Sequence, residues 1–248
     1  MTVLLDRRDG VGVITIDLPE RRNSLTLPMS AQLVEHVRAC EQDDAVHAIV
    51  VTGAPPAFCA GADLTALGEA REEGLRAIYA GFLAVASSIL PTVAAVNGAA
   101  VGAGLNLALA CDVRLVGPKA RFDARFLQLG LHPGGGMTWL SQRLVGPQTA
   151  AAMTLFGQVL DADEAVRTGL AFRKADDVVA AALEFCTATA KAPRDLVVTT
   201  KRTLRTTATY DRHDDAVETE LVAQLASMET PAFAELLSAM RERISRQA

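Results

Sequence analysis

Two segments of small residues could bring backbone amides close to a ligand. The first reads Phe58-Cys59-Ala60-Gly61-Ala62-Asp63-Leu64, and the second reads Ala95-Val96-Asn97-Gly98-Ala99-Ala100-Val101-Gly102-Ala103-Gly104. Small side chains leave room for backbone N–H groups to approach a bound molecule. The second segment leads into a predicted helix at residues 105–110, so its N–H groups lie at the positive end of a helix dipole. Together the two segments predict an oxyanion hole, in which preorganised donors stabilise a developing negative charge.

The elements around these segments alternate between strand and helix. Strands are expected at residues 11–18, 47–52, 92–96 and 113–116, and helices at residues 27–40, 75–90 and 104–110. Thr26 and Asp63 are the expected N-caps of the helices that follow them, and Pro91 ends the long helical run. Strand–helix–strand repetition of this kind predicts an α/β fold with parallel strand pairing.

The pattern changes near Ala192-Pro193. Three helices that are polar on one face follow, at residues 194–207, 211–228 and 231–243, with no strand pattern between them. We therefore expect a core region at residues 1–192 and a helical region at residues 193–248.

Composition narrows the class of protein. The 248 residues can bury a substantial core, and the net charge of −5 gives no reason to expect nucleic acid as a partner. No apolar stretch reaches the length of a membrane span, and the N-terminus lacks the apolar region of a signal peptide. The four cysteines are far apart and form neither a CxxC site nor a disulfide framework. A cytoplasmic protein with buried thiols and no metal site is expected.

The order and spacing of these pieces resemble the crotonase superfamily, the enoyl-CoA hydratase/isomerase fold. The resemblance also covers Pro19-Glu20-Arg21-Arg22-Asn23-Ser24-Leu25, Cys111-Asp112-Val113-Arg114 and Pro133-Gly134-Gly135-Gly136. It implies a spiral of ββα turns, followed by a C-terminal helical trimerisation region that helps to close the acyl site. The implied partners are an acyl-CoA substrate and further copies of the chain, as a homotrimer or a dimer of trimers (a hexamer). Coenzyme A would arrive as part of the substrate, with no tightly bound cofactor.

The resemblance assigns roles to residues of both small-residue segments. The backbone N–H groups of Ala62 and Ala103 match the positions that bind the thioester oxygen, where negative charge develops when an enolate forms. Arg21 and Arg22 are candidate phosphate partners, because a guanidinium suits phosphate oxygens; the alternative is that both are solvated loop residues. The residues implied in coenzyme A binding are Arg22, Leu25, Ala60, Ala62, Asp63 and Leu64.

The chain departs from the family at the acid/base positions. Hydratases of this family use two glutamates, because one proton must leave a water while another reaches the α-carbon. Here the matching positions are Asn106 and Phe126, and a third carboxylate used by some branches would fall at Gly134. None of these residues can act as a general base, so the two-glutamate hydration mechanism is not supported.

Three other residues could replace the missing groups. His132 lies in a loop near the expected site, and imidazole titrates near neutral pH, although it could instead hydrogen-bond to loop backbone. Asp123 could take part in proton transfer or simply form a salt bridge with Arg125. Asn106 could hydrogen-bond a water or a substrate group without transferring a proton, or it could be a helix-surface amide satisfied by neighbouring backbone. Phe126 and Trp139 suit an apolar or aromatic acyl group, or belong to the core.

Two functional hypotheses of different classes follow. The first is an enzyme of the hydratase/isomerase group whose acid/base residues have changed, with His132, Asp123 and Asn106 as candidates. The second is a catalytically inert protein of the same fold that binds an acyl-CoA or a protein partner. A panel of acyl-CoA thioesters discriminates between them, because pure binding stabilises the fold without forming product.

Overall fold

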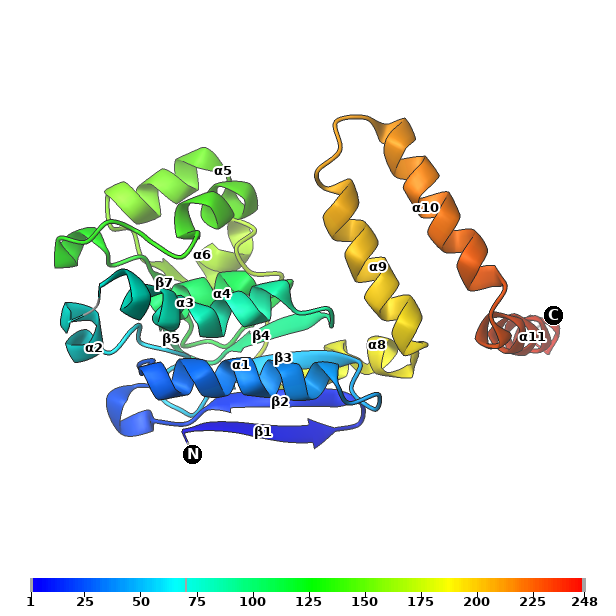
Figure 1. The fold of residues 1–248 in the computed structure, drawn as a ribbon, viewed down its shortest axis with the longest axis horizontal. Coiled ribbons are helices and arrows are strands. Elements are labelled where there is room, and N and C mark those ends of the chain that lie inside the picture. The colour runs from blue at the N-terminus through cyan, green and yellow to red at the C-terminus, as the bar shows by residue number, and fades with distance from the viewer. Residues whose placement is uncertain (1, 70, 247–248) are drawn as a thin grey trace. The chain divides into compact units, whose positions relative to one another are not determined.

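The computed structural model describes residues 2–69 and 71–246. The chain forms two compact units, one ending at Ala190 and the other beginning at Lys191. Figure 1 shows the ribbon, with its helices and strands labelled.

The first unit is built around a six-stranded sheet in the order β1-β2-β3-β4-β6-β9. Its strands are β1 (Val3–Arg8), β2 (Val11–Ile16), β3 (Ala48–Gly53), β4 (Thr92–Val96), β6 (Val113–Val116) and β9 (Arg173–Lys174). The β1 and β2 strands form an antiparallel hairpin, and every other pair of neighbours is parallel. A second sheet consists of β5 (Ala99–Val101), β7 (Arg121–Asp123) and β8 (Leu160–Asp161). The predicted α/β fold with parallel pairing is confirmed.

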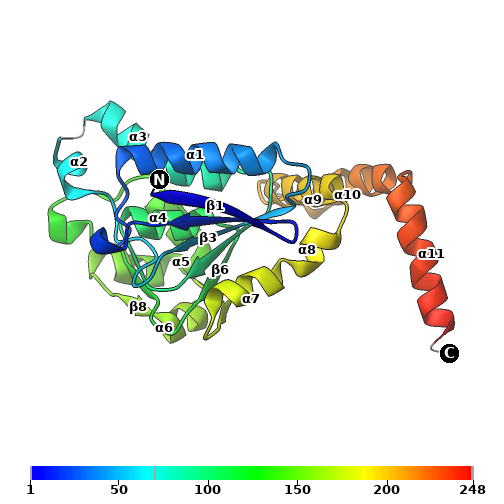
Figure 2. The same cartoon turned by 90° about the horizontal axis from the view of Figure 1, so that it is seen from below.

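Helices connect the strands and cover the larger sheet. They are α1 (Leu27–Glu41), α2 (Leu64–Glu69), α3 (Glu72–Ser87), α4 (Ala103–Ala110), α5 (Met137–Leu155), α6 (Ala162–Arg167), α7 (Val178–Phe185) and α8 (Thr187–Lys191), with 3-10 turns η1 (Pro19–Arg21) and η2 (Leu127–Leu129). The α1 and α3 helices pack against each other. Figure 2 shows α1 and α7 on opposite sides of the sheet.

The core follows from strand alternation, since successive side chains of a strand point to opposite faces. On one face, alternate residues of β2, β3, β4 and β6 pack against α7, where Val178, Ala182 and Cys186 are buried. All four cysteines are buried and free, as the sequence predicted. The α4 helix is buried from Gly104 to Ala110, so it lies inside the unit and only its first residue is accessible.

Most predicted elements are present, with shifts at their ends. Thr26 caps α1 as expected, because its hydroxyl accepts a hydrogen bond from the Met29 N–H at 3.4 Å. The helix predicted at residues 75–90 begins earlier and ends at Ser87, since Ser88 is extended at φ −52° and ψ 136°. The strand predicted at residues 11–18 ends at Ile16. The edge strand β1 was not predicted, because its mixed charged and apolar residues resemble a polar terminus.

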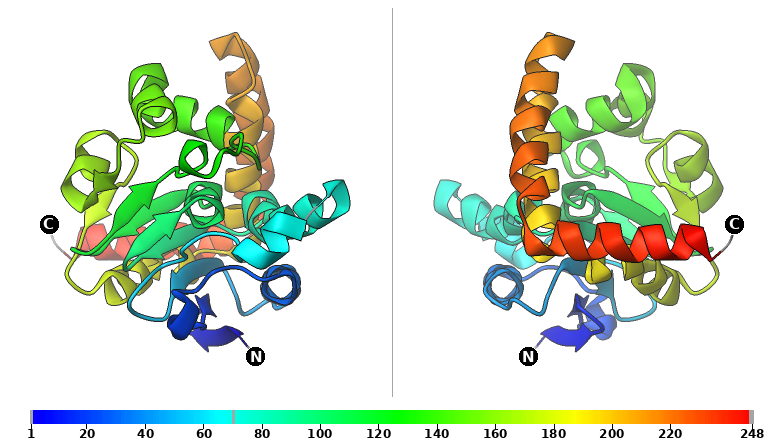
Figure 3. Two further views of the ribbon diagram at one scale, coloured as in Figure 1. Left: turned by 90° about the vertical axis from the view of Figure 1, so that its left-hand side faces the viewer. Right: turned by 90° about the vertical axis from the view of Figure 1, so that its right-hand side faces the viewer.

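The second unit contains the helices α9 (Arg194–Thr207), α10 (His213–Met228) and α11 (Pro231–Ser245) and no strand among its described residues. Figures 1 and 3 show α9 and α10 running side by side, while α11 turns away from α10. The turn is stabilised by Thr230, whose hydroxyl accepts a hydrogen bond from the Phe233 N–H at 3.2 Å. In the described part of the chain, no helix combines the length and the apolar character needed to cross a membrane.

Candidate active site

The loop that carries Ala62 is held by one parallel bridge to Leu25. The Leu25 N–H donates to the Gly61 carbonyl at 2.7 Å, and the Asp63 N–H donates to the Leu25 carbonyl at 2.8 Å. In a parallel pair, the residues on either side of the bridged residue supply these hydrogen bonds. The N–H of Ala62 therefore faces away from Leu25 and toward the opposite side of the loop.

A second bridge joins the two small-residue segments to each other, between Cys59 and Ala100. The Cys59 N–H donates to the Ala99 carbonyl, and the Val101 N–H donates to the Cys59 carbonyl, both at 3.0 Å. Gly104 makes this approach possible, because a Cβ atom there would lie 2.0 Å from the Cys59 carbonyl oxygen. The glycine is thus required by close backbone packing at the start of α4.

Near these two bridges, the backbone amides of Ala62 and Ala103 belong to residues that line one cavity. Ala103 is the first residue of α4, so its N–H has no partner within the helix. Among the described residues, neither the Ala62 N–H nor the Ala103 N–H donates a hydrogen bond. Both residues line the same cavity. This arrangement can bind an oxyanion, since backbone donors without partners need an acceptor from a ligand or from water.

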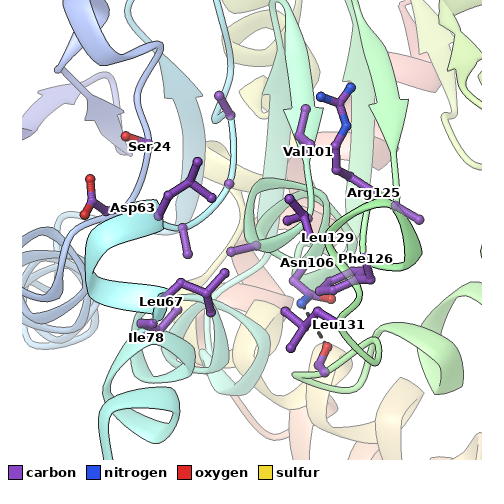
Figure 4. Close-up of a pocket in the computed structure, with 18 of the residues that line it drawn as sticks. Ser24, Asp63, Leu67, Ile78, Val101, Asn106, Arg125, Phe126, Leu129 and Leu131 are labelled. Carbon is purple, nitrogen blue, oxygen red and sulfur yellow. Dashed lines mark hydrogen bonds between the residues drawn. The ribbon is translucent and has the colours of Figure 1, made fainter. Parts of the chain in front are cut away.

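The cavity has a volume of about 720 Å³ and is lined by both polar and apolar side chains. Figure 4 shows Ser24 and Asp63 on one side, and Asn106, Phe126 and Leu131 on the other. The polar lining includes the side chains of Glu20, Arg21, Arg22, Ser24 and Asp63. The apolar lining comes from Leu67, Leu75, Ile78, Phe126, Leu129 and Leu131. This apolar lining also contains polar side chains, since Asn106 and Arg125 lie beside Phe126 and Leu129.

Arg21 and Arg22 have different surroundings in the structure, although the sequence made both of them candidates for binding phosphate. Arg21 forms an ion pair of 2.5 Å with Asp63, whose side chain is only 8% exposed. Asp63 also accepts a hydrogen bond from the Thr65 N–H at 3.1 Å, at the start of α2. Arg22 is exposed at the cavity and forms no ion pair with a described residue. The guanidinium of Arg22 is therefore the better placed of the two to bind an anionic group of a ligand.

Asn23 fixes the loop that presents Arg22. Both residues have left-handed backbone conformations, with φ 51° at Arg22 and φ 59° at Asn23. The Asn23 side chain is fully buried and donates to the carbonyls of Ala54 and Ala57, both at 2.7 Å. Its Oδ1 accepts a hydrogen bond from the Leu18 N–H at 2.9 Å. These contacts give Asn23 a positioning role that the sequence did not reveal.

Asn106 and Phe126, at the two predicted acid/base positions, both line the cavity. Asn106 is 2% exposed, and its Nδ2 donates to the Gly134 carbonyl at 3.0 Å. Its Oδ1 is buried and has no partner among the described residues. The Asn106 amide is therefore enclosed by protein and held by the Gly134 loop, and neither Asn106 nor Phe126 can transfer a proton.

Asp123 is buried behind the cavity and is not one of the lining residues. It forms an ion pair with Arg125, whose Nε donates at 2.9 Å, and Arg125 does line the cavity. Asp123 therefore reaches a ligand only through Arg125. The salt bridge is the alternative that the sequence had left open, and the role of Asp123 in proton transfer stays a prediction.

His132 lines the cavity and is exposed. Its Nδ1 lies 2.7 Å from the carbonyl oxygen of Pro133. Because a carbonyl can only accept, Nδ1 must carry the hydrogen in this contact, which leaves Nε2 available to a ligand. The loop-backbone contact expected as the alternative is present, and it is compatible with proton transfer at Nε2.

The other predicted residues do not all line the cavity. Ala60 and Leu64 line the cavity, whereas Leu25 is buried and contributes its backbone to the bridge with Ala62. Trp139 is 55% exposed and lies outside the lining, with Arg143 over its ring at 3.8 Å. Tyr79 also lines the cavity. No local signal identifies it, because tertiary packing brings it there.

Cys59 precedes the lining residue Ala60 but does not itself line the cavity. Burial raises the pKa of the Cys59 thiol to about 12, so at neutral pH this group is not a thiolate nucleophile. Within residues 2–69 and 71–246, no group of three or more histidine, cysteine, aspartate or glutamate side chains could hold a metal ion.

Known proteins share this sequence and fold. A family model described as enoyl-CoA hydratase/isomerase matches residues 6–245. A Mycobacterium tuberculosis protein named "Probable enoyl-CoA hydratase echA14" is 54% identical over 250 residues, with 97% of this chain and 98% of that protein covered. The Escherichia coli 1,2-epoxyphenylacetyl-CoA isomerase is 37% identical over 176 residues, covering 68% and 67% of the two chains. The crystal structure of a Bacillus anthracis enoyl-CoA hydratase has a TM-score of 0.92 at 27% identity, covering 98% and 97%.

The fold and the cavity define an α/β protein of the crotonase type. The chain belongs to the enoyl-CoA hydratase/isomerase family.

Proposed function

We propose that this chain binds an acyl-CoA thioester and catalyses hydratase- or isomerase-type chemistry with altered acid/base residues. The observation that carries the proposal is the pair of amides, Ala62 N–H and Ala103 N–H, without partners in the described chain and on one cavity. A thioester oxygen bound between them would gain stabilisation as an enolate forms. Arg22 would lie with the phosphates, and the apolar side chains would surround the acyl group.

The proton-transfer groups in this proposal differ from two glutamates. His132 is the first candidate, because its Nε2 has no fixed partner among the described residues and the residue lines the cavity. Asp123 would act on the substrate through Arg125 rather than directly. Asn106 would hold a water or a substrate group without transferring a proton.

The competing function is an inert acyl-CoA-binding or partner-binding protein. Asn106 and Phe126 favour it, since neither side chain can serve as a general acid or base. The two functions differ in product formation and not in binding.

The test incubates the purified protein with crotonyl-CoA and other acyl-CoA thioesters, following both thermal stability and loss of the enoyl-thioester absorbance. Stabilisation with turnover supports the enzyme, and stabilisation without turnover of any thioester supports the binding protein. If no thioester changes the melting temperature, the proposal of acyl-CoA binding is wrong. Exchange of His132 for Ala and of Asp123 for Asn then tests the two proton-transfer candidates against the wild-type rate.

We further propose that the chain assembles as a homotrimer or a dimer of trimers. The family resemblance supports this assembly through the helical second unit. Light scattering of the eluted protein measures the mass, and a monomer or a dimer would contradict the proposal.

A further inference from the structure

The carboxylate of Asp63 belongs to the residue directly after the amide donor Ala62. Its side chain is only 8% exposed, and it forms an ion pair of 2.5 Å with Arg21, which also lines the cavity. Asp63 helps to order this loop, because its N–H donates to the Leu25 carbonyl and its Oδ1 accepts from the Thr65 N–H. A negative charge that the local structure uses therefore lies next to one of the two amide donors.

The second amide donor has a similar neighbour in β7. Asp123 is the last residue of β7, and its carbonyl accepts a hydrogen bond of 3.0 Å from the N–H of Gly102, which precedes Ala103. The Asp123 side chain is 5% exposed and forms an ion pair with Arg125, a lining residue of the cavity. The Asp123 Oδ1 is buried and accepts no hydrogen bond from a described residue. Arg125 therefore supplies the counter-charge of Asp123 in the described part of the chain.

The two ion pairs share one arrangement, and Figure 4 shows Asp63 and Arg125 on opposite sides of the cavity. In each pair the carboxylate is nearly buried, while the arginine side chain is 53% exposed at Arg21 and 49% exposed at Arg125. The ion pair of Asp6 with Arg8, outside the cavity lining, differs because that carboxylate is 58% exposed. Water screens an exposed carboxylate, whereas a buried one depends on its ionic partner.

An uncompensated carboxylate at either place would oppose the chemistry of the amide pair. Enolate formation puts negative charge on the thioester oxygen, and a second negative charge nearby repels it. At an effective dielectric of about 20, one unit charge changes an equilibrium roughly tenfold even across about 12 Å. Asp63 adjoins Ala62 in the chain, and Asp123 binds the N–H of Gly102, so this repulsion would be substantial from both carboxylates.

We propose that Arg21 and Arg125 are positioning residues that act on the oxyanion site through their partner carboxylates. They compensate the charges of Asp63 and Asp123, so that the two amides can hold an enolate oxygen. This inference rests on the proposed function, and it gives the Asp123–Arg125 pair an electrostatic role that requires no proton transfer. Both arginines keep half of their side chain exposed at the cavity, which places positive charge on the side where the ligand binds.

The test uses acetoacetyl-CoA, whose enolate absorbs in the near-ultraviolet and forms when C2 loses one proton to the buffer. Because no turnover is required, the measurement applies equally to an enzyme and to a binding protein. Absorbance at one fixed pH gives the ratio of enolate to keto form on the protein. Calorimetry with butyryl-CoA gives the affinity for a thioester that stays neutral at the acyl group. We expect the wild type to raise the enolate ratio above its value in buffer.

Arg125→Gln should lower the bound enolate ratio roughly tenfold, while butyryl-CoA affinity changes less than about threefold. The double variant Arg125→Gln/Asp123→Asn removes the charge together with its partner and should restore most of the ratio. Arg125→Lys keeps the positive charge and should stay close to the wild type. Arg21→Gln and Arg21→Gln/Asp63→Asn make the same comparison at the other pair.

Arg8→Gln is the control, because it breaks the exposed ion pair with Asp6 and should change neither measurement. Circular dichroism checks that each variant is folded. Charge compensation is overturned if both single Arg→Gln variants keep the wild-type enolate ratio, or if the double variants are no better than the single ones. Tight butyryl-CoA binding by the wild type without enrichment of the enolate also overturns it, and leaves acyl-CoA binding intact. If no thioester binds at all, the proposed function is wrong, and this inference with it.

Discussion

Gly104 packs against the carbonyl of Cys59 so closely that a Cβ atom would lie 2.0 Å from the oxygen. The contact joins the first residues of α4 to the loop that precedes Ala62, and so sets the spacing of the two unpartnered amides. Gly104 lies in the helix α4, where replacing glycine with alanine usually stabilises a protein. At this position the clash of the new Cβ atom acts against that gain. The clash is severe because the Cβ atom would meet backbone atoms of Cys59, which cannot rotate away as a side chain can.

Gly104→Ala should therefore destabilise the protein by about 1–3 kcal/mol, the usual cost of overpacking. It should also weaken acyl-CoA binding, since the two segments must move apart. Gly117→Ala is the matched control, because its Cβ would meet its nearest neighbours at an ordinary 3.6 Å. Urea unfolding measures both variants, and equal stabilities would show that the close approach is not required.

Ala103→Pro tests the amide donor itself. Proline removes the N–H at the first position of α4, where helices tolerate it, and the preceding Gly102 can adopt unusual backbone angles. Loss of one oxyanion donor should lower turnover roughly 100- to 1,000-fold with little change in circular dichroism. His213→Pro makes the same change at the first position of α10, outside the cavity lining, and should leave turnover intact. A similar rate in both variants would remove Ala103 from the mechanism.

Arg22 and Arg21 should differ in their effects on ligand binding. Arg22→Ala should weaken acyl-CoA binding about three- to tenfold, because it removes a cation that is exposed at the cavity. The same variant should bind an acyl-N-acetylcysteamine thioester as well as the wild type, since that ligand has no phosphate. Arg21→Ala should lower stability instead, by breaking the ion pair with the nearly buried Asp63. Equal losses for both ligands with Arg22→Ala would contradict phosphate recognition.

The buried thiols should make stability fall at high pH. Burial raises the pKa of Cys59 to about 12 and those of Cys40 and Cys186 to about 11, against an ordinary value of 9.0. Above pH 9 the unfolded chain loses these protons while the native state retains them, so the free energy of unfolding decreases as pH rises toward 11–12. Below pH 9 the contribution is complete.

Urea unfolding between pH 8 and pH 11 measures this slope, and Cys59→Ala should make it shallower. The native protein at pH 8 should also resist thiol reagents until it unfolds, because all four cysteines are buried. Rapid labelling of the native state would show that a thiol is accessible.

Local patterns in the sequence were sufficient for much of the fold. The alternation of strands and helices, the N-cap at Thr26 and the buried cysteines all depend on short-range chemistry, and the structure confirms them. The same holds for the family, because the small-residue segments that indicate it are contiguous in the chain. The edge strand β1 was missed, since charged side chains on its exposed face obscure the apolar residues that pack inward.

The catalytic roles of Ala62, Ala103 and His132 stay predictions. All three residues line one cavity, although each was chosen from its own stretch of sequence. Each of them lies in a segment whose own composition suggested a site. The assignment of Asn106 and Phe126 to the two acid/base positions likewise stays a prediction, because it rests on matching the order of residues along the chain to the family.

Tertiary structure alone decided which neighbours those residues have. It pairs Arg21 with Asp63 and leaves Arg22 exposed at the cavity, although the two arginines are adjacent in the sequence. It also brings the Tyr79 hydroxyl against Gly134. Side-chain partners distant in sequence depend on how helices and loops pack in three dimensions, and no periodicity or local motif encodes that packing.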